Sequence, residues 1–392
     1  MCTTKIGLFG FGVVGQGLYQ LLHESQEINA EIKKICIKDP NKKRTIEKGY
    51  FTTTPEEIIN DPEIDIIVEL IDDAEAALQI VKNAFENGKP VVSANKKMIA
   101  ENLDLLLKWQ DKYQLPFLYE ASCCAGIPII RNLEEYYDND LLKSVEGIFN
   151  GSTNYILSQL YHLNESFDHV LLDAQQKGLA ESNPSLDIDA IDPKYKLGII
   201  IFHAFGLVID PPDIFNFGIR KLNQFDIDFA RKRGKRIRLL AKCQKEDEKI
   251  QAWCAPSLVD EGSILSHTEN EFNAVLLEGA FSDRQCLIGK GAGDRPTGSA
   301  VLSDISALTY QYRYEYKKRN SIQLNTYLDH SRVHHVYVRY NGSIHPDLKD
   351  FDEISEQYIG EDGKYLIGSI KQITLQNANW LDHPDLNILF MN

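Results

Sequence analysis

The chain has 392 residues, of which 43% are hydrophobic and 25% charged, and its formal net charge at pH 7 is −15. This length supports two or three domains with a substantial core, and the composition excludes a disordered or fibrous protein. The negative charge argues against nucleic acid bound through a broad basic surface, because such binding requires clustered Lys and Arg.

The Lys and Arg residues are spread along the chain except in ARKRGKRIR, residues 230–238. We interpret this run as a solvated helix face, with a phosphate-binding patch as the other possibility. No apolar run approaches the roughly 20 residues of a membrane span, and MCTTKIGLFG enters a strand pattern at once, so we expect a cytoplasmic protein. The seven cysteines lack CxxC spacing, which favours a reducing compartment, with adjacent Cys123 and Cys124 as buried thiols.

The first 130 residues alternate short apolar runs with helical or polar stretches. The runs are KIGLF, KKICIK, DIIVELI, PVVSA and PFLYEAS. This alternation is typical of βαβ units and predicts a parallel sheet covered on both faces. Between the third and fourth runs, residues 74–88 place Leu78, Val81 and Phe85 on one side at helical spacing and end at Gly88. We expect a helix there that packs on the sheet.

A glycine-rich turn follows the first predicted strand. GLFGFGVVGQGL places Gly10, Gly12 and Gly15 in GxGxxG spacing. The first glycine permits the tight turn, the second lets the backbone approach a pyrophosphate, and the third allows close packing of helix on strand. At the first turn of a βαβ series, this pattern predicts a Rossmann-type dinucleotide site.

The end of the second run should contact the adenosine ribose. It reads KICIKDPNKKR, which offers Asp39 for a ribose 2′-hydroxyl and four cations for a 2′-phosphate: Lys38, Lys42, Lys43 and Arg44. The two indications conflict. We favour NADP slightly over NAD, and a solvated loop without preference is the alternative.

The pattern changes at about residue 131. Longer predicted helices (STNYILSQLYHL and KYKLGIIIFHAFGLVI) mix with strand-like runs (LLKSVEGIF, KIQAWCA and AVLLEG), so residues 131–310 predict a second α/β or α+β domain. After Tyr310 the stretch YQYRYEYKKRN resembles a connector. The strand-like runs HHVYVRY, KYLIGSIKQI and LNILFM predict a small β-rich C-terminal domain over residues 320–392.

SLDIDAIDPKYKL, residues 185–197, sets three aspartates among apolar residues. A calcium-binding EF-hand would need glycine and glutamate at the sixth and twelfth positions, where this chain has Asp192 and Gly198. A helix N-terminus fits better, with Asp192 as the N-cap and Pro193 at the first helical position.

Lys196 lies four residues after Asp192, so an ammonium and a carboxylate can pair on one helix face. A lysine held in this way can give or take a proton. The preceding loop adds Glu181, and this group of carboxylates suits a substrate that carries an ammonium group.

Six blocks now carry a resemblance to the homoserine dehydrogenase family over roughly residues 4–315. The blocks are GFGVVG, VVSANKKMIA, YEASCCAGIPII, GIFNGSTNYIL, AQQKGLAESNPSLDIDAIDPKYKL and GAGDRPTGSAVLSDI. The resemblance implies NAD(P)H-dependent reduction of L-aspartate 4-semialdehyde to L-homoserine, in threonine and methionine biosynthesis. It also implies a homodimer or homotetramer paired through the substrate domain, and we expect no aspartate-kinase domain.

The resemblance implies roles for individual residues. Lys196 is the expected proton donor and acceptor, assisted by Lys96 and Asp192. The expected substrate-binding residues are Glu181, Asp187, Asp192, Asn150, Gly151 and Ser152, although an ordinary turn with Ser152 capping the helix is equally compatible. The expected cofactor-binding residues are Gly10, Phe11, Gly12, Val13, Val14, Gly15, Lys38, Asp39, Ile71, Asp72, Ser93, Lys96 and Gly293, so that the chain returns to the nucleotide domain near residues 291–318.

A monovalent cation, Na⁺ or K⁺, is also implied by the resemblance. Its ligands would be the Glu120 side chain and backbone carbonyls at Cys123, Ala125 and Ile127, because backbone oxygens suit a hard cation.

The sequence departs from the family pattern at three places. VELIDDAE has Asp72 and Asp73 where the family has glycines, GLAE has Leu179 in place of tyrosine, and Asn183 stands where the family has an aspartate before the proline. Two alternatives stay open. One is a different Rossmann-type enzyme that acts on another amino-acid semialdehyde or keto acid, and the other, supported by Asp72 and Asp73, is a non-catalytic NAD(P)-binding sensor with a decayed active site. The C-terminal region lacks the PGVL-like turn of a regulatory ACT module, so its ACT character is expected to be degenerate or absent.

Overall fold

The structure is a computed structural model that describes residues 3–25, 28–44, 46–139, 141–163, 165–342 and 344–391. The chain forms two compact units, each built from three segments. The first unit contains Met1–Asn139, Phe202–Val208 and Lys290–Ser321. The second unit contains Asp140–Ile201, Ile209–Gly289 and Ile322–Asn392.

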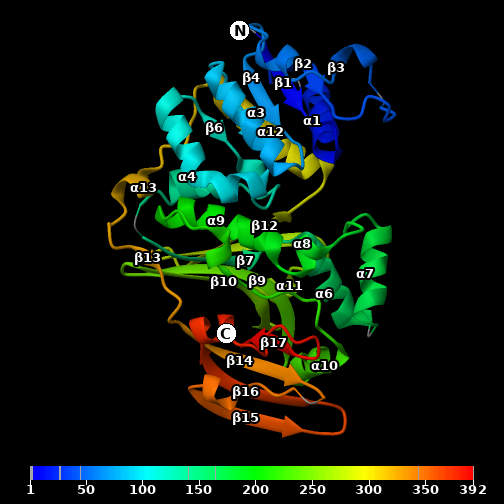
Figure 1. The fold of residues 1–392 in the computed structure, drawn as a ribbon, viewed down its shortest axis with the longest axis vertical. Helices are drawn as coiled ribbons and strands as arrows, with labels where there is room; N and C mark the ends of the chain where they lie inside the picture. Colours follow the sequence, from blue (N-terminus) through cyan, green and yellow to red (C-terminus); the bar gives the residue numbers. More distant parts are fainter. Residues whose placement is uncertain are drawn as a thin grey trace. The chain divides into compact units, whose positions relative to one another are not determined.

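The first unit contains the predicted parallel sheet, with six strands in the order β3-β2-β1-β4-β5-β6 (Figure 1). Its strands are β1 (Thr4–Phe9), β2 (Ala30–Cys36), β3 (Phe51–Thr52), β4 (Ile66–Glu69), β5 (Val91–Ser93) and β6 (Phe117–Leu118). All residues of β4 and β5 are buried, as expected for strands covered by helices on both faces. PFLYEAS was predicted as one strand, but β6 ends at Leu118 and Glu120–Ser122 forms a 3₁₀ turn.

The helices of the first unit are α1 (Val13–Glu24), α2 (Glu56–Ile59), α3 (Ala74–Glu86), α4 (Lys96–Tyr113), α5 (Ile129–Arg131), α12 (Asp294–Thr309) and α13 (Lys317–Ser321). The predicted helix over residues 74–88 is confirmed as α3, and Gly88 follows it with a φ of +71°. Val81 and Phe85 are buried on its inner side.

The second unit contains a mixed sheet of eleven strands. The main path is β12-β11-β7-β9-β10-β17-β14-β16-β15, and β8 and β13 also pair with β10. Its strands are β7 (Leu142–Ile148), β8 (Phe215–Asn216), β9 (Lys235–Glu246), β10 (Lys249–Asp260), β11 (Phe272–Gly279), β12 (Arg284–Lys290), β13 (Tyr327–Leu328), β14 (Val333–Tyr340), β15 (Glu353–Ile359), β16 (Lys364–Lys371) and β17 (Asn387–Phe390). Its helices are α6 (Gly151–Leu163), α7 (Phe167–Gln176), α8 (Ser185–Ile188), α10 (Gln224–Lys232), α11 (Ile264–His267) and α14 (Gln372–Gln376).

The C-terminal strands extend this sheet (orange to red in Figure 1). β17 lies parallel to β10 through the pair Ser257 and Phe390, and antiparallel to β14. Phe390 belongs to a buried cluster with Trp253 of β10 and Val336 of β14. The last 70 residues therefore share one core with the second unit.

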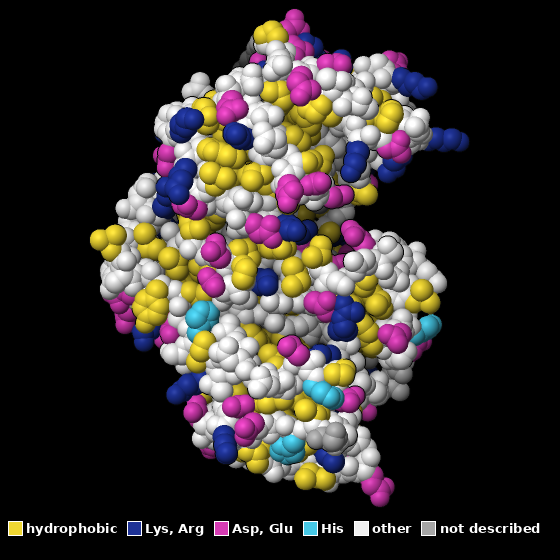
Figure 2. Space-filling model, viewed as in Figure 1, with side chains coloured by type: hydrophobic (Ala, Val, Ile, Leu, Met, Phe, Trp, Pro, Cys, Tyr) yellow, Lys and Arg dark blue, Asp and Glu magenta, His cyan; other side chains and the backbone are white. Residues whose placement is uncertain are grey.

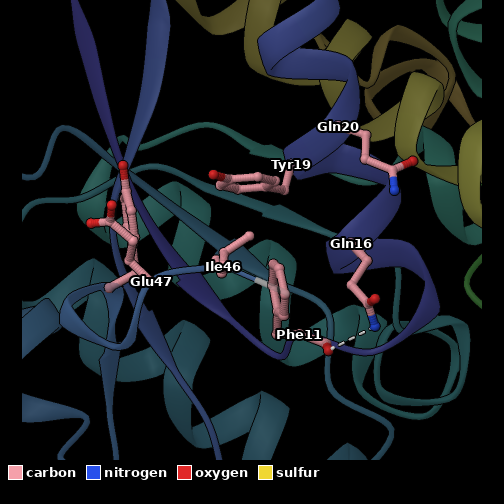
Figure 3. A pocket seen from close by; sticks show the side chains of 7 residues that line it. Phe11, Gln16, Tyr19, Gln20, Ile46 and Glu47 are labelled. Atoms are coloured by element: carbon pink, nitrogen blue, oxygen red, sulfur yellow. Dashed lines mark hydrogen bonds between the residues drawn. The ribbon is translucent and has the colours of Figure 1, made fainter. Parts of the chain in front are cut away.

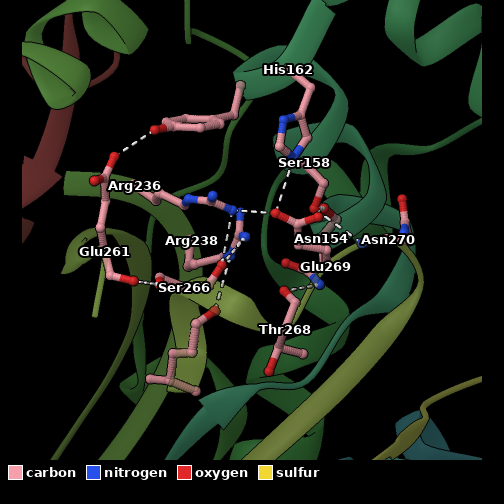
Figure 4. Close-up of polar contacts among 12 residues, drawn as sticks. Asn154, Ser158, His162, Arg236, Arg238, Glu261, Ser266, Thr268, Glu269 and Asn270 are labelled. Atoms are coloured by element: carbon pink, nitrogen blue, oxygen red, sulfur yellow. Dashed lines mark hydrogen bonds and ion pairs between the residues drawn. The ribbon is translucent and has the colours of Figure 1, made fainter. Parts of the chain in front are cut away.

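The basic run at residues 230–238 is not a solvated helix face, and that prediction was wrong. Helix α10 ends at Lys232 and β9 begins at Lys235. Arg238 is fully buried, and its guanidinium donates to the carbonyl oxygens of Leu265 and Ser266 at 3.2 and 2.8 Å (Figure 4). Burial lowers the pKa of Arg238 to about 10. The run thus fastens the carbonyl end of α11 to β9.

The stretch after Tyr310 is packed rather than free. Tyr314 and Tyr316 are buried in the first unit, where the hydroxyl of Tyr314 accepts the backbone N–H of Tyr119 at 3.2 Å. The ring nitrogen Nε2 of His203 lies 2.9 Å from the hydroxyl of Tyr119. This aromatic cluster holds the stretch against the end of the parallel sheet.

Within the described residues, no helix is long and apolar enough to cross a membrane. Figure 2 shows acidic side chains interspersed with basic ones on one face of the molecule. The surplus of negative charge is therefore distributed on that face and not gathered into one block.

Candidate active site

The glycine-rich turn connects β1 directly to α1. Gly10 has a φ of +95°, and a Cβ atom there would lie 2.5 Å from the carbonyl oxygen of Leu70. A Cβ atom on Gly15 would lie 2.5 Å from the carbonyl oxygen of Gly10. Both positions therefore require glycine, the first for the turn and the second for close packing of α1.

Gly12 faces open space. A Cβ atom there would meet nothing within 4 Å, and as the N-cap of α1 this residue provides no side-chain hydrogen bond to the helix. Val13, the first helical residue, is 65% exposed. The amides of the first turn and the helix dipole can therefore receive an anion, and a dinucleotide pyrophosphate fits this position.

The loop after β2 carries the residues predicted to contact the ribose. Lys38 and Asp39 are both exposed, and Oδ1 of Asp39 accepts the amide of Asn41 at 2.8 Å. The Arg44 guanidinium lies 5.1 Å from the ring centre of Phe51, and its Nε is buried without a hydrogen-bond partner among the described residues. The loop thus engages its carboxylate in a turn and keeps Lys38 at its surface, whereas the Nε of Arg44 is buried.

A cavity of about 460 Å³ lies beside the glycine-rich turn, between α1 and the segment before β3 (Figure 3). It is lined by Phe11, Gln16, Tyr19, Gln20, Ile46, Glu47 and Tyr50. The side-chain amide of Gln16 donates to the carbonyl oxygen of Phe11 at 3.5 Å. The cavity therefore borders the turn through Phe11.

The ends of β4 and β5 form the other edge of the cofactor region in the first unit. Glu69 ends β4 and Ser93 ends β5, and both side chains are fully buried. The hydroxyl of Ser93 donates to Oε2 of Glu69 at 2.5 Å, and the amide of Ile71 donates to Oε1 at 2.7 Å. Burial raises the pKa of Glu69 to about 7. Lys96 is the first residue of α4.

The two aspartates that replace family glycines have different environments. Asp73 is the N-cap of α3, and its side chain accepts the amide of Ala76 at 3.1 Å. It therefore stabilises a helix start. Asp72 is exposed, and its charge contributes to the raised pKa of Glu69.

Helix α12 brings residues 290–321 back to the glycine-rich turn. Gly293 precedes it with a φ of +120°. A Cβ atom on Gly17 of α1 would lie 2.3 Å from the carbonyl oxygen of Asp294, and one on Gly298 would lie 2.9 Å from the amide of Leu18. The two helices therefore touch backbone to backbone, and Gly293 directly precedes the residue whose carbonyl faces Gly17.

The segment predicted to bind a cation forms a sharp turn in the first unit. Cys124 and Ala125 have φ values of +54° and +36°, and Cys123, Cys124, Ala125 and Ile127 are buried. Successive residues in the left-handed region redirect the backbone carbonyls. Within the described residues, no group of three or more His, Cys, Asp or Glu side chains could hold a metal ion.

Glu120 is tied into the backbone near this turn. Its carboxylate oxygens accept the amides of Ile130 and Arg131, both at 2.8 Å. Burial and the nearby Asp304 raise the pKa of Glu120 to about 8. The carboxylate is thus already engaged, and any cation at the turn would depend mainly on the backbone carbonyls.

The second unit brings four predicted residues together. The Lys196 ammonium donates to Oδ2 of Asp192 and to the carbonyl oxygen of Phe149, both at 2.7 Å. The Asn150 side-chain amide donates to Oδ1 of Asp187 at 2.7 Å and to Oδ2 of Asp192 at 2.8 Å. Lys196 and Asp192 are 7% and 4% exposed. Because both charges are buried, each depends on its partners and has a fixed orientation.

Asn150 also caps α6. Its side-chain oxygen accepts the amide of Thr153 at 2.9 Å, so its amide nitrogen can only point toward the two aspartates. Capping by Ser152 was wrong, because α6 begins at Gly151 and the Ser152 hydroxyl donates to the carbonyl oxygen of Leu179 at 2.5 Å.

Helix α9 (Ile191–Phe205) starts two residues earlier than predicted. Ala190, with a φ of +61°, turns the chain into the helix, so Asp192 lies in the first turn and is not the N-cap. The predicted spacing of four residues to Lys196 is unaffected, and the pair forms on one face.

Unlike these buried side chains, Glu181 is exposed. It lies on the loop after α7, and its backbone carbonyl oxygen accepts a hydrogen bond from the Gln175 side-chain amide at 2.9 Å. Through Leu179, Ser152 fastens this loop to the start of α6.

Two contributors were not predicted. The Phe149 carbonyl cannot be assigned from side-chain chemistry. Glu69 could have been found as a carboxylate inside an otherwise apolar buried strand.

Two family models match this chain. The one described as "Homoserine dehydrogenase, NAD binding domain" matches residues 10–120, and the one described as "Homoserine dehydrogenase" matches residues 128–306. The chain is 33% identical to the homoserine dehydrogenase of Bacillus subtilis over 322 residues, 80% of this chain and 74% of that protein. It is 36% identical to that of Helicobacter pylori over 330 residues, 82% and 75% of the two chains.

Solved structures are also similar. The homoserine dehydrogenase from Thiobacillus denitrificans superposes with a TM-score of 0.85 at 26% identity, covering 100% of this chain and 98% of that one. A Staphylococcus aureus homoserine dehydrogenase gives a TM-score of 0.74 at 25% identity, with 100% and 99% coverage. A hyperthermophilic archaeal homoserine dehydrogenase mutant, solved in complex with NADPH, has a similar fold, with a TM-score of 0.67 over 80% of this chain and 99% of that one.

Proposed function

The chain belongs to the homoserine dehydrogenase family, and from that premise we propose how its residues divide the reaction. The protein is an NAD(P)-dependent oxidoreductase that interconverts L-aspartate 4-semialdehyde and L-homoserine, a step of amino-acid biosynthesis. Family membership favours this activity over a non-catalytic sensor. When bound, the cofactor supplies the hydride that reaches the carbonyl carbon.

Lys196 is the group that moves the proton. Its ammonium gives a proton to the aldehyde oxygen during reduction, and its neutral amine takes the proton back during oxidation. The observation that carries this proposal is the buried set of contacts from Lys196 to Asp192 and the Phe149 carbonyl, which fixes the position of Nζ. Proton transfer requires such fixed reach. Lys96, at the start of α4, assists at the nicotinamide end.

Asp187, Asp192 and Asn150 bind the substrate. Two carboxylates joined by one amide suit the amino group of homoserine, and Gly151, Ser152 and Glu181 complete this site. Residues 131–310 therefore supply the substrate site, and residues 1–130 with the return near 291–318 supply the cofactor site.

The cofactor contacts are the glycine-rich turn from Gly10 to Gly15, including Phe11, Val13 and Val14, with Ile71, Asp72, Ser93 and Gly293. NADP is preferred over NAD. Support comes from the loop after β2, where Asp39 is engaged in a turn while Lys38 is exposed. A 2′-phosphate suits such a donor.

A monovalent cation, Na⁺ or K⁺, binds at the turn of Cys123, Ala125 and Ile127. The left-handed backbone at Cys124 and Ala125 supports a ring of carbonyl ligands, and Glu120 lends negative charge when ionised.

The active protein is a cytoplasmic homodimer or homotetramer. Support comes from the edge of the second sheet, where Ile288 of β12 is 52% exposed near the exposed Phe272 and Ile264. An apolar patch beside an edge strand suits contact with a second copy.

The test is homoserine-dependent reduction of NAD and NADP at alkaline pH by the wild type and by Lys196→Ala. We expect turnover by the wild type, higher kcat/KM with NADP, and a loss of about a hundredfold or more in kcat for the variant. Lys232→Ala, which removes an exposed lysine at the end of α10, is the matched control and should retain full activity. Equal activity of Lys196→Ala would contradict the proton-transfer role.

A further inference from the structure

A closed cycle of hydrogen bonds joins the two loops that follow β4 and β5. Oε1 of Glu69 accepts the amide of Ile71 at 2.7 Å, and the carbonyl oxygen of Ile71 accepts the Asn95 side chain at 3.0 Å. The amide of Asn95 donates to the hydroxyl of Ser93 at 3.1 Å, and this hydroxyl donates to Oε2 of Glu69 at 2.5 Å. Glu69 therefore receives one bond from the loop after β4 and one from the last residue of β5.

The parallel register makes this cycle possible. Glu69 lies opposite Ser93 of β5 on one side and Phe9 of β1 on the other. The carboxyl ends of all three strands thus meet at one level of the sheet, where ligands of such folds bind. The cycle joins the ends of β4 and β5.

Two residues of the cycle directly precede residues of the proposed cofactor site. Asp72 follows Ile71, and Lys96 follows Asn95. Asn95 is also the N-cap of α4, because its side-chain oxygen accepts the amide of Met98 at 2.9 Å. The direction in which α4 presents Lys96 is therefore set by a residue that the cycle holds.

The cycle also supports the glycine-rich turn. Leu70, between Glu69 and Ile71, donates its amide to the carbonyl oxygen of Phe9 at 2.8 Å. The carbonyl oxygen of Leu70 is the atom that a Cβ atom on Gly10 would meet at 2.5 Å. A shift of the Leu70–Ile71 segment would therefore disturb the turn that receives the pyrophosphate.

We propose that Glu69 is a positioning residue of the dehydrogenase reaction, which sets the cofactor loops that carry Asp72 and Lys96 through Ile71 and Ser93. This inference rests on the proposed cofactor contacts. Glu69 is fully buried, and its carboxylate contacts Ile71 and Ser93, so it acts on Asp72 and Lys96 through the backbone and the cap of α4.

The charge state of Glu69 provides a specific readout. Burial raises its pKa to about 7, and the charge of Asp72 adds to this rise, whereas the hydrogen bonds from Ser93 and Ile71 act to lower the pKa. Phe9 and Ser93, its neighbours on β1 and β5, are uncharged, whereas α4 brings Lys96 and Lys97 to the same end of the sheet. The carboxyl is neutral below pH 7 and becomes a buried charge above it, next to the charge of Asp72.

The test compares the pH dependence of the KM for NADP(H), from about pH 5 to about pH 9, in the wild type, Glu69→Gln and Glu69→Ala. We expect the wild-type KM to rise as the pH passes through about 7 and the Glu69→Gln profile to lose this inflection, because glutamine keeps the acceptor for Ile71 and stays neutral. Glu69→Ala should raise the KM for the cofactor about tenfold at every pH, with the KM for homoserine unchanged.

Glu31→Gln is the matched control, since it removes an exposed carboxylate from β2 of the same sheet and should leave the profile unchanged. If Glu69→Ala does not fold, Ser93→Ala breaks the same cycle, and its cofactor KM is expected to rise likewise. Two results would overturn the inference. One is an unchanged inflection in Glu69→Gln, and the other is a cofactor KM equal to that of the wild type in Glu69→Ala or in its substitute Ser93→Ala.

The outcome is separable from the proposed function. A wild type without homoserine-dependent turnover would contradict the function, and the inference would then be decided by NADPH fluorescence titration of the same variants over the same pH range. There too, loss of the wild-type inflection in Glu69→Gln supports the inference and its retention overturns it.

Discussion

Asn150 shows how one side chain can serve the fold and the chemistry together. Its oxygen caps α6 at the amide of Thr153, and this bond dictates that its nitrogen faces Asp187 and Asp192. The amide therefore separates two carboxylates that would otherwise repel each other. Asp192 in turn orients Lys196, so the position of the proton donor depends on a helix cap.

Asn150→Ala should lower kcat/KM for homoserine by about tenfold or more, because the two aspartates lose their shared donor and Asp192 can turn from Lys196. The KM for NADP should stay unchanged, since the cofactor contacts lie in the first unit. Steady-state kinetics with both substrates checks this. Asn183→Ala, at an exposed position of the loop before α8, is the control, and equal losses in both variants would contradict the role of Asn150.

The residues that could be predicted from the sequence are those whose function depends on local spacing. Gly10, Gly12 and Gly15 have the predicted geometry, and Asp192 and Lys196 pair at four residues as expected. The Glu69 cycle could not be predicted, because it depends on the register between β4 and β5, which no local pattern specifies. The helix start at Ile191 depends on the left-handed Ala190, a conformation that alanine seldom adopts.

At the scale of elements, the same limit explains the basic run and the C-terminal strands. Alternating Arg236 and Arg238 occur in a strand whose buried face accepts a guanidinium only because the carbonyls at the end of α11 lie there (Figure 4). β17 joins the second sheet through a pairing between residues 257 and 390, more than 100 residues apart. Local periodicity identified the strands but not their partners.

The junction of β10, β14 and β17 contains a buried histidine. His334 of β14 is 1% exposed, with its ring centre 4.8 Å from that of Trp253 and 4.5 Å from that of Phe390. Burial lowers the pKa of His334 to about 4. The folded state therefore keeps this ring neutral at pH values where an unfolded chain would protonate it.

Because the pKa of His334 is lower in the folded state, its contribution to stability is complete above about pH 6.5 and is lost as the pH falls toward about 4. His334→Gln should therefore reduce the fall in Tm between these pH values by a few degrees, whatever its Tm at neutral pH. Thermal unfolding followed by circular dichroism measures this. His335→Gln removes an exposed histidine from the same strand and should retain the wild-type slope; a wild-type slope in His334→Gln would refute the assignment.

At the scale of the whole molecule, we expect self-association through the edge of the second sheet. Light scattering should give a mass of two or four times 44.6 kDa. Ile288→Lys places a charge on the apolar patch beside β12 and should shift the protein toward the monomer by at least about tenfold in dissociation constant. Leu324→Lys, at an exposed leucine away from β12 in the sequence, is the control and should leave the mass unchanged. A monomeric wild type would contradict the proposed assembly.

The return of α12 to α1 has a consequence for biogenesis. Gly17 and Gly298 let the two helices meet backbone to backbone, yet about 280 residues of chain separate them. A ribosome that adds 5–20 residues per second needs on the order of ten seconds to translate residues 140–289, and throughout this time the face of α1 that α12 will cover is exposed. The nucleotide-binding unit is thus begun first and completed late, so the nascent chain must keep this face from aggregating until residue 309 has emerged.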